Sequence, residues 1–449
     1  MRGAFVHATV LPVNESQRDA GLVRAVGPVA LAASIINIVI GAGIFAVPGA
    51  LAASMGVYAP VAFLVCGIAI GAIAICFAEG ESRIPTSGGA YGYIEAAFGP
   101  LPGYVAGTLL CLANVLSCGG IAAALADVAV SLFPRQFVAP VRVTVIIGVI
   151  GGIALVNLGG VAHGARLVNT AAGLKLIPIA IFVVAGAGAI HRANFVQTVQ
   201  PGTAGLGRAL ILALFLLTGM EIPLSASGEV KHPARTIPRA LAMGMVSVTL
   251  LYVAIQIIAQ GILGPALANS TEPLADAMAR VSPTLRLLML TGAALSMFGW
   301  ISSDILGSPR VLFAFARDGL LPRVLGRVHP HRHVPQVAIL SYAALAAGLA
   351  VSGTFAELAV LSTLAVSVVY MGGCAAAWKL ARRGVALAGA PLNFRWLGTA
   401  MVIGVTGMLI VIALASRAEV LGLLGVVGGS ALIYLLQTRG GISRRQIPE

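Results

Sequence analysis

Runs of about 18 or more apolar residues recur along almost the whole chain and constrain its fold more than any other feature. A helix of that length spans the hydrocarbon core of a bilayer. Hydrophobic residues make up 59% of the 449 residues and charged residues only 10%, whereas a soluble domain usually carries about a quarter charged residues. The sequence therefore predicts an all-α, polytopic membrane protein.

Polar breaks divide the apolar runs into about twelve expected membrane-spanning helices. The expected crossings are residues 26–53, 58–80, 101–131, 141–158, 168–190, 207–228, 239–262, 285–315, 335–352, 356–380, 395–415 and 419–437. The longest polar connections are residues 81–98, 190–206, 263–284 and 316–334. Residues 1–25 and 438–449 are expected to be tails, and the first lacks the apolar core of a signal peptide.

Basic residues in the expected loops set the orientation. When the N-terminal tail is placed in the cytoplasm, most Lys and Arg residues fall on the cytoplasmic side, as the positive-inside rule requires. Both termini are therefore expected on the cytoplasmic side of the cell's inner (cytoplasmic) membrane. The net charge of +13 is interpreted as this topology signal with a weak attraction to anionic lipid, and no nucleic-acid partner is predicted.

Motifs that would indicate an enzyme are missing from the sequence. It has no paired carboxylates, HExxH, GxSxG or Cys/His cluster. The run "HPHRH" at 329–333 is expected in a solvated loop. The five cysteines lie in apolar segments, where packing is expected rather than disulfides or metal ligation: Cys66, Cys76, Cys111, Cys118 and Cys374. No catalytic residue, metal or cofactor is predicted.

The first crossing contains "IGAGIFAVP", which puts Gly41-Ala42-Gly43 near its middle and Pro48 soon after. Both residue types weaken a helix. In lipid an unpaired backbone group is costly, so a broken helix survives only where protein or a polar cavity satisfies it. The amide end of such a break attracts a carboxylate, and the carbonyl end attracts an ammonium group or a cation. Close helix packing at the glycines is the alternative explanation.

A second break is expected in the sixth crossing, where Thr218-Gly219 is followed by Glu221 and Pro223. Paired broken helices in corresponding halves are typical of the midplane site of secondary transporters. The two breaks are five crossings apart, and this odd offset makes the corresponding helices antiparallel. We therefore expect inverted repeats over 26–190 and 207–380, followed by two further helices over 395–437.

Four stretches of the sequence resemble the amino acid–polyamine–organocation transporter superfamily. They are "IGAGIFAVP" (40–48), "AEGESRIPTSGGAYGYIEAAFGP" (78–100), "TGMEIPLSASGEVKHPARTIPRA" (218–240) and "SPRVLFAFARDGLLP" (308–322). The resemblance covers nearly the whole chain. It implies a five-plus-five inverted-repeat core with broken first and sixth helices, and transport of amino acids by alternating access.

The same resemblance implies a substrate site made of backbone atoms. The first break would bind the α-carboxylate through the backbone of Gly41, Ala42, Gly43 and Ile44. The sixth helix would offer carbonyl groups to the α-amino group near Phe215, Leu216 and Thr218. Glycine suits the first role because a side chain would block the carboxylate.

Lys175 lies inside the fifth crossing with no acidic residue nearby in sequence. An ammonium inside a membrane is costly and usually functional, so Lys175 is a candidate proton carrier; snorkelling to an interface is the alternative. The resemblance implies that its ammonium replaces the cation that sodium-coupled relatives hold between the first and eighth helices. The nearest candidates to line that site are Ser296, Ser302 and Ser303, although each serine can equally bond its own helix.

Glu221 matches a commonly acidic position of the superfamily and is expected either to carry protons or to bond the unwound backbone. Asp127 is expected near an outer helix end and solvated, whereas no role is assigned to the deeper Asp304. Phe215 is the only aromatic residue near the sixth-helix break, and no acidic selectivity residue is evident. These departures from the arginine- and polyamine-type exchangers favour a neutral substrate.

The predicted function is therefore proton-coupled uptake of neutral amino acids. An exchanger of amino acids, or of an amino acid against a polyamine, stays open, and a non-transporting sensor is a remote alternative. The expected partners are an amino acid, protons and the bilayer. The oligomeric state is left open between a monomer and a homodimer.

Overall fold

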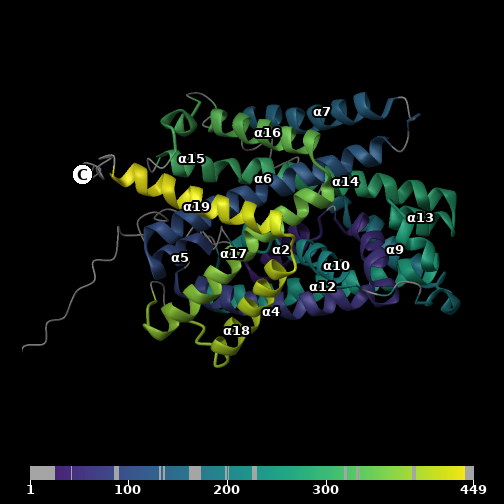
Figure 1. The fold of residues 1–449 in the computed structure, drawn as a ribbon, viewed down its shortest axis with the longest axis horizontal. Helices are drawn as coiled ribbons and strands as arrows, with labels where there is room; N and C mark the ends of the chain where they lie inside the picture. The colour runs from purple at the N-terminus through teal and green to yellow at the C-terminus, as the bar shows by residue number, and fades with distance from the viewer. Residues whose placement is uncertain are drawn as a thin grey trace, which may run out of the picture.

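The computed structural model describes residues 26–41, 43–84, 90–130, 133–134, 137–160, 173–197, 200, 202–224, 230–317, 321–329, 332, 334–386 and 391–439. Over these residues the protein is built almost entirely of helices (Figure 1). In chain order they are α2 (Pro28–Val39), η1 (Gly43–Phe45), α3 (Val47–Met55), η2 (Gly56–Tyr58), α4 (Ala59–Arg83), α5 (Ala90–Phe98), α6 (Pro100–Val130), α7 (Val138–Leu158), α9 (Leu176–Ala187), η4 (Arg192–Asn194), α10 (Thr203–Leu217), α11 (Glu221–Leu224), α12 (Pro233–Leu263), η6 (Gly264–Asn269), α13 (Pro273–Ala279), α14 (Pro283–Gly307), α15 (Pro309–Arg317), η7 (Arg323–Gly326), α16 (Gln336–Ser352), α17 (Phe355–Arg382), α18 (Leu397–Ala413) and α19 (Arg417–Arg439).

The described residues contain 8 helical segments that are long and apolar enough to cross a membrane. They are Val47–Arg83, Pro100–Val130, Val138–Leu158, Thr203–Leu224, Pro233–Asn269, Pro283–Phe313, Phe355–Arg382 and Arg417–Thr438. Four shorter apolar helices are Pro28–Val39, Leu176–Ala187, Gln336–Ser352 and Leu397–Ala413. Each expected crossing contains at least part of one of these helices, so a polytopic, helical membrane protein is confirmed.

Two of the expected polar connections are wrong in detail because each contains a whole α-helix. Residues 81–98 include the end of α4 and all of α5, and residues 263–284 include η6 and α13. In α5 the buried apolar residues are Ala90, Tyr93, Ile94 and Ala97. They repeat at the helical period, so α5 buries one face on the bundle, and its polar neighbours hid this short pattern.

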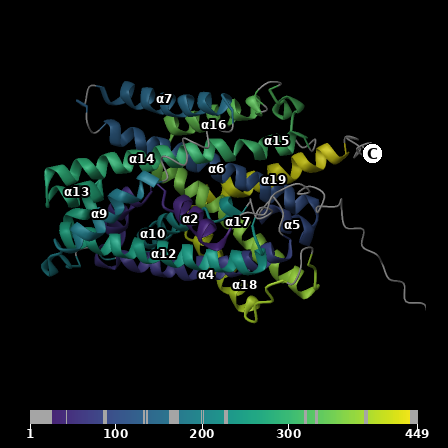
Figure 2. The ribbon, with the colours of Figure 1, turned by 180° about the vertical axis from the view of Figure 1, so that it is seen from behind.

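The broken helices lie inside the bundle. In both views α2 and α10 lie among other helices, α7 and α16 run along one edge, and α18 marks the opposite edge (Figures 1 and 2). Helix α12 packs against α2 and α4, and α10 packs against α3, α4 and α17. Exposed leucines on α19 (Leu421, Leu424, Leu436) give it an outer, lipid-facing surface. Surrounding helices therefore shield the interrupted backbone from lipid, as the energetics of unpaired groups require.

Candidate functional site

The first break separates α2, which ends at Val39, from the single turn η1, which begins at Gly43. Ala42 lies outside the described residues. The Ala46 amide donates to the Gly43 carbonyl at 3.0 Å, whereas the first amides of a helical turn, here those of Gly43 and Ile44, have no partner within that turn. Ile44, the middle residue of this turn, is fully buried.

Side chains from other helices satisfy the carbonyl groups at the end of α2. The Lys175 ammonium donates to the carbonyl oxygen of Asn37 and, at 2.9 Å, to that of Ile40. The Tyr252 hydroxyl donates to the Val39 carbonyl at 2.7 Å. The carbonyl end of a helix carries a partial negative charge, so the ammonium lies where that charge favours it.

Lys175 is 2% exposed and points into the bundle, so its ammonium does not snorkel to a membrane surface. No ion pair between this lysine and a carboxylate is found within the described ranges. Its partners are thus backbone carbonyls of the first break, the kind of oxygen that also coordinates a sodium ion.

The three predicted serines of α14 lie in different environments. Ser296 donates to the Gly41 carbonyl at 3.3 Å and so faces the first break. Ser302 and Ser303 donate to carbonyls of their own helix, those of Phe298 at 2.7 Å and Gly299 at 3.0 Å. Ser302 and Ser303 therefore bond within their own helix, which is the alternative that the sequence left open.

The second break separates α10, which ends at Leu217, from α11, which begins at Glu221. Gly219 between them has φ +110°, a conformation that glycine adopts readily and other residues rarely do. Thr218 donates to the Phe215 carbonyl through its amide at 3.3 Å and through its hydroxyl at 2.7 Å. The Phe215 carbonyl, which was predicted to bind substrate, therefore already accepts hydrogen bonds from Thr218. The carbonyls of Leu216 and Leu217 lie at the end of the helix, where carbonyls have no partner within the helix.

The two breaks pack directly on each other. A Cβ atom at Gly43 would lie 2.7 Å from Leu216 Cδ1, and one at Gly219 would lie 3.2 Å from Ile38 Cγ2. Each break thus places a glycine against a side chain of the other. A side chain at Gly43 would therefore require the Leu216 side chain to shift.

Glu221 follows the second break and is buried. Its Oε2 accepts a 2.5 Å hydrogen bond from the Tyr370 hydroxyl and a 3.2 Å bond from the Gly219 amide. The carboxyl group therefore bonds the unwound backbone, one of its two expected roles, and α17 supplies the partner.

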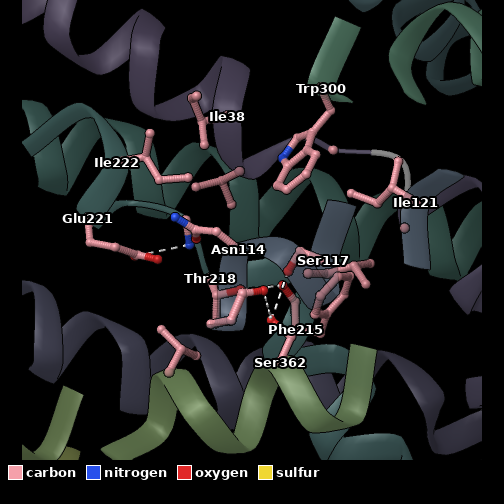
Figure 3. A pocket seen from close by; sticks show the side chains of 17 residues that line it. Ile38, Asn114, Ser117, Ile121, Phe215, Thr218, Glu221, Ile222, Trp300 and Ser362 are labelled. Carbon is pink, nitrogen blue, oxygen red and sulfur yellow. Dashed lines mark hydrogen bonds between the residues drawn. The ribbon is translucent and has the colours of Figure 1, made fainter. Parts of the chain in front are cut away.

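A cavity lies between the breaks (Figure 3). Six predicted residues line it: Gly41, Gly43, Phe215, Leu216, Thr218 and Glu221. Neither Lys175 nor the three α14 serines are among its lining residues. Figure 3 shows Trp300 on one side of the cavity and Ser117, Thr218 and Ser362 on the other.

Comparison with known proteins agrees with this geometry. A family model described as "Amino acid permease" matches residues 26–418. The chain belongs to the amino acid permease family. An uncharacterized transporter of Mycobacterium tuberculosis is 34% identical over 345 residues, covering 74% of each chain. The methylthioribose transporter of Bacillus subtilis is 27% identical, covering 74% of this chain and 76% of its own. The branched-chain amino acid permease of the same organism is 27% identical, covering 73% and 75%.

The resemblance to the amino acid–polyamine–organocation superfamily is thereby confirmed, and the relatives of this permease are named as transporters or permeases and not as enzymes.

Several residues that line the permease cavity were not predicted from the sequence. Asn114 and Ser117 of α6, Trp300 of α14 and Ser362 of α17 all face it. Ser117 and Ser362 bond each other at 2.8 Å across the two helices. A polar residue inside a long apolar run, such as Asn114, was the available signal, because the membrane interior disfavours such groups unless they have a function or a partner.

Proposed function

We propose that this permease carries neutral amino acids across the cytoplasmic membrane, as proton-coupled uptake by alternating access. The observation that carries the proposal is the cavity between two broken helices. Unbonded amides are expected where η1 begins and unbonded carbonyls where α10 ends. A free amino acid has one carboxylate and one ammonium group and complements both ends at once. The predicted backbone site, including Ala42 and Ile44, belongs to this proposal.

The lining of the cavity favours an uncharged substrate side chain. Apart from Glu221, its lining residues are apolar, glycine, or neutral polar residues such as Asn114 and Ser362. Glu221 Oε2 accepts hydrogen bonds from the Tyr370 hydroxyl and the Gly219 amide. Glu221 is therefore a poor partner for a cationic substrate. The branched-chain specificity in the name of one relative agrees with an apolar side chain.

Coupling to protons is proposed from the position of Lys175. Its ammonium bonds the carbonyls at the first break, while Ser296 of α14 bonds the next carbonyl, that of Gly41. A fixed positive charge in this place disfavours sodium, and loss of its proton would free the carbonyls of α2. The alternative function, exchange of amino acids or of an amino acid against a polyamine, uses the same cavity.

The proposal includes the full topology. Residues 26–190 and 207–380 would form two inverted repeats of five crossings, and residues 395–437 two further crossings. The tails, residues 1–25 and 438–449, would both be cytoplasmic. The odd offset between the two broken helices and the distribution of basic residues support this arrangement.

A ligand panel on the purified protein tests the substrate class. Neutral amino acids such as leucine, valine and alanine are expected to raise the melting temperature, because a ligand at a hundred times its Kd stabilises by about 2.7 kcal/mol. Lysine, arginine, glutamate and methylthioribose serve as comparisons. A larger shift with a charged amino acid or with methylthioribose would contradict the neutral amino acid assignment.

Uptake into proteoliposomes tests the mode of transport. An inwardly directed proton gradient is expected to drive accumulation, and a protonophore is expected to abolish it. Uptake that needs amino acid preloaded in the vesicles, and that ignores the gradient, would establish exchange instead. Binding without flux in either protocol would indicate a sensor.

Replacement of Glu221 tests whether it also carries protons, the second of its two expected roles. Glu221→Gln keeps the shape of the side chain but cannot ionise, so the pH dependence of uptake is expected to flatten. Tyr370→Phe is the matched control, because it removes the 2.5 Å donor and leaves the carboxyl group in place. An unchanged pH profile in Glu221→Gln would assign Glu221 only to bonding the unwound backbone.

A further inference from the structure

A second buried carboxyl group, Asp304, lies on α14 away from both breaks. The side chain is 4% exposed. Its Oδ2 accepts from the Tyr342 hydroxyl of α16 at 2.6 Å, and its Oδ1 accepts from the Ser308 hydroxyl at 2.6 Å. No ion pair of Asp304 with a basic side chain is present within the described part of the chain. A carboxyl group held by neutral donors alone can exchange a proton without breaking an ion pair.

Asp304 is connected to the cavity by one further hydrogen bond. The Asn114 amide nitrogen donates to Ser308 Oγ at 3.1 Å. Asn114 lines the cavity between the broken helices, whereas Ser308 does not. A continuous chain of hydrogen bonds therefore runs from the cavity through Asn114 and Ser308 to the buried carboxyl group.

The other titratable groups around Asp304 leave this chain intact. Helix α6 turns Cys111 and Cys118 toward it, and the Cys118 thiol is within hydrogen-bonding reach. Helix α16 contributes Tyr342. Four other charged side chains that the structure describes lie on or beside the helices packed against α14. Lys175 beside α9 bonds α2, and Arg142 of α7 pairs with Asp127. Asp276 of α13 bonds Ser270, and Arg310 of α15 is exposed.

Proton uptake at Asp304 would reverse the direction of this chain. When the carboxyl group is ionised, Ser308 must donate to it, and the free lone pair of Ser308 accepts from the Asn114 amide nitrogen. When the carboxyl group is protonated, it donates to Ser308, whose hydroxyl hydrogen can then be given to the Asn114 side-chain oxygen. The Asn114 amide turns over, and its NH₂ group becomes available to the cavity.

We propose that Asp304 binds a proton coupled to substrate binding and acts as a positioning residue for Asn114. The inference rests on the proposed function, because it concerns affinity for an amino acid in the same cavity. A carboxylate accepts hydrogen bonds and donates none, so an NH₂ group facing the cavity strengthens its binding. Substrate affinity then rises as Asp304 takes up its proton, and substrate binding promotes that uptake.

Infrared difference spectroscopy on the purified wild type tests the proton site without any ligand. Titration of the ligand-free protein is expected to show a protonated carboxyl band that Asp304→Asn removes and Glu221→Gln leaves. Added neutral amino acid at fixed pH is expected to increase the same band. A titration in which Asp304→Asn changes no carboxyl band would overturn the inference, even if amino acid transport is established.

The pH dependence of the amino acid Kd tests the connection to Asn114. One linked proton changes affinity by at most about tenfold per pH unit, and this slope is expected in the wild type. Ser308→Ala interrupts the chain of hydrogen bonds but keeps the Asp304 carboxyl group. It is expected to reduce the slope to less than about twofold per pH unit, as Asp304→Asn does. Tyr342→Phe removes a donor to Asp304 that is not part of this chain of hydrogen bonds, and it is expected to retain the slope.

An unchanged slope in Ser308→Ala and Asp304→Asn would overturn the coupling. If Asp304→Asn does not fold, Ser308→Ala decides the question alone, because its carboxyl group retains the Tyr342 donor. Failure of the wild type to bind any amino acid would instead contradict the proposed function, and the ligand-free titration would still decide whether Asp304 binds a proton.

Discussion

Lys175→Ala is expected to reduce uptake by roughly ten- to a hundredfold while changing amino acid affinity much less. The ammonium donates to two carbonyls at the first break and is buried. A hydrogen bond to a charged group is worth about 1.5–3 kcal/mol, and about 1.4 kcal/mol corresponds to a factor of ten. The transport rate should fall more than the affinity, because Lys175 bonds the carbonyls at the end of α2 and does not line the cavity. Initial uptake rates and Kd, measured on the same preparation, separate the two effects.

Two further variants distinguish a proton role from a structural one. Lys175→Arg keeps the positive charge but cannot release a proton, so it is not expected to rescue uptake. Lys175→Met removes the charge and keeps most of the side-chain length, and it should behave like Lys175→Ala. Normal uptake in Lys175→Arg would show that only the positive charge is needed.

Sodium independence of the wild type follows from the same geometry. A sodium ion about 4 Å from the ammonium would meet a repulsion of about 4 kcal/mol at an effective dielectric constant of 20, or about a thousandfold in affinity. Uptake is therefore expected to be equal in sodium and potassium buffers. Strong stimulation by sodium would contradict the assignment of Lys175 to the cation position.

The helix breaks were predictable from the sequence because their signal is local. Gly41 and Gly43 interrupt one apolar run, and Gly219 with Pro223 interrupts another. The structure ends α2 at Val39 and α10 at Leu217, close to those residues. Backbone properties of glycine and proline act within a few residues, so the chain order alone carries this information.

The side chains that complete the cavity were not predictable in the same way. Asn114 and Ser117 lie on α6 and Ser362 on α17, and both helices are buried on most of their surface. Such helices have no polar face, so hydrophobic periodicity cannot indicate which side faces the cavity. Only the packing of distant helices makes that choice.

The ion pair between Glu79 and Arg83 shows the same limit outside the site. The stretch "AEGESR" was useful only as part of a resemblance. In the structure the two side chains are buried and 2.8 Å apart. Arg83 bonds the Val385 carbonyl and Glu79 bonds the Phe394 amide, so the pair anchors the segment after α17 to the end of α4. Partners some 300 positions away leave no trace in the local pattern.

Gly43→Val is expected to weaken amino acid binding by more than about a hundredfold, the second large effect. A Cβ atom at this position would lie 2.7 Å from Leu216 Cδ1 and 3.6 Å from Phe355 Cζ, and valine adds two methyl groups beyond it. The side chain would also cover the amides that begin η1, which are proposed to bind the carboxylate. Loss of a hydrogen bond to a charged group costs about 1.5–3 kcal/mol, and two such bonds exceed a hundredfold.

A matched control separates this loss from a general defect in folding. Gly152 lies on the exposed side of α7, and a Cβ atom there would meet nothing within 4 Å. Gly152→Val is therefore expected to bind amino acids like the wild type. Melting temperatures and elution profiles of the two variants, measured in the same detergent, report whether each is folded.

The double variant Gly43→Val/Leu216→Ala decides between a binding role and a packing role for the first break. If Gly43 serves only for close packing, removal of the Leu216 side chain relieves the contact and should restore affinity. If the valine covers the carboxylate site, the second substitution leaves that obstacle in place and affinity stays low. We expect the latter result, together with poor competition by amines that lack a carboxylate. Restored affinity in the double variant, or wild-type affinity in Gly43→Val, would assign the break to packing and remove the amides of η1 from the proposed site.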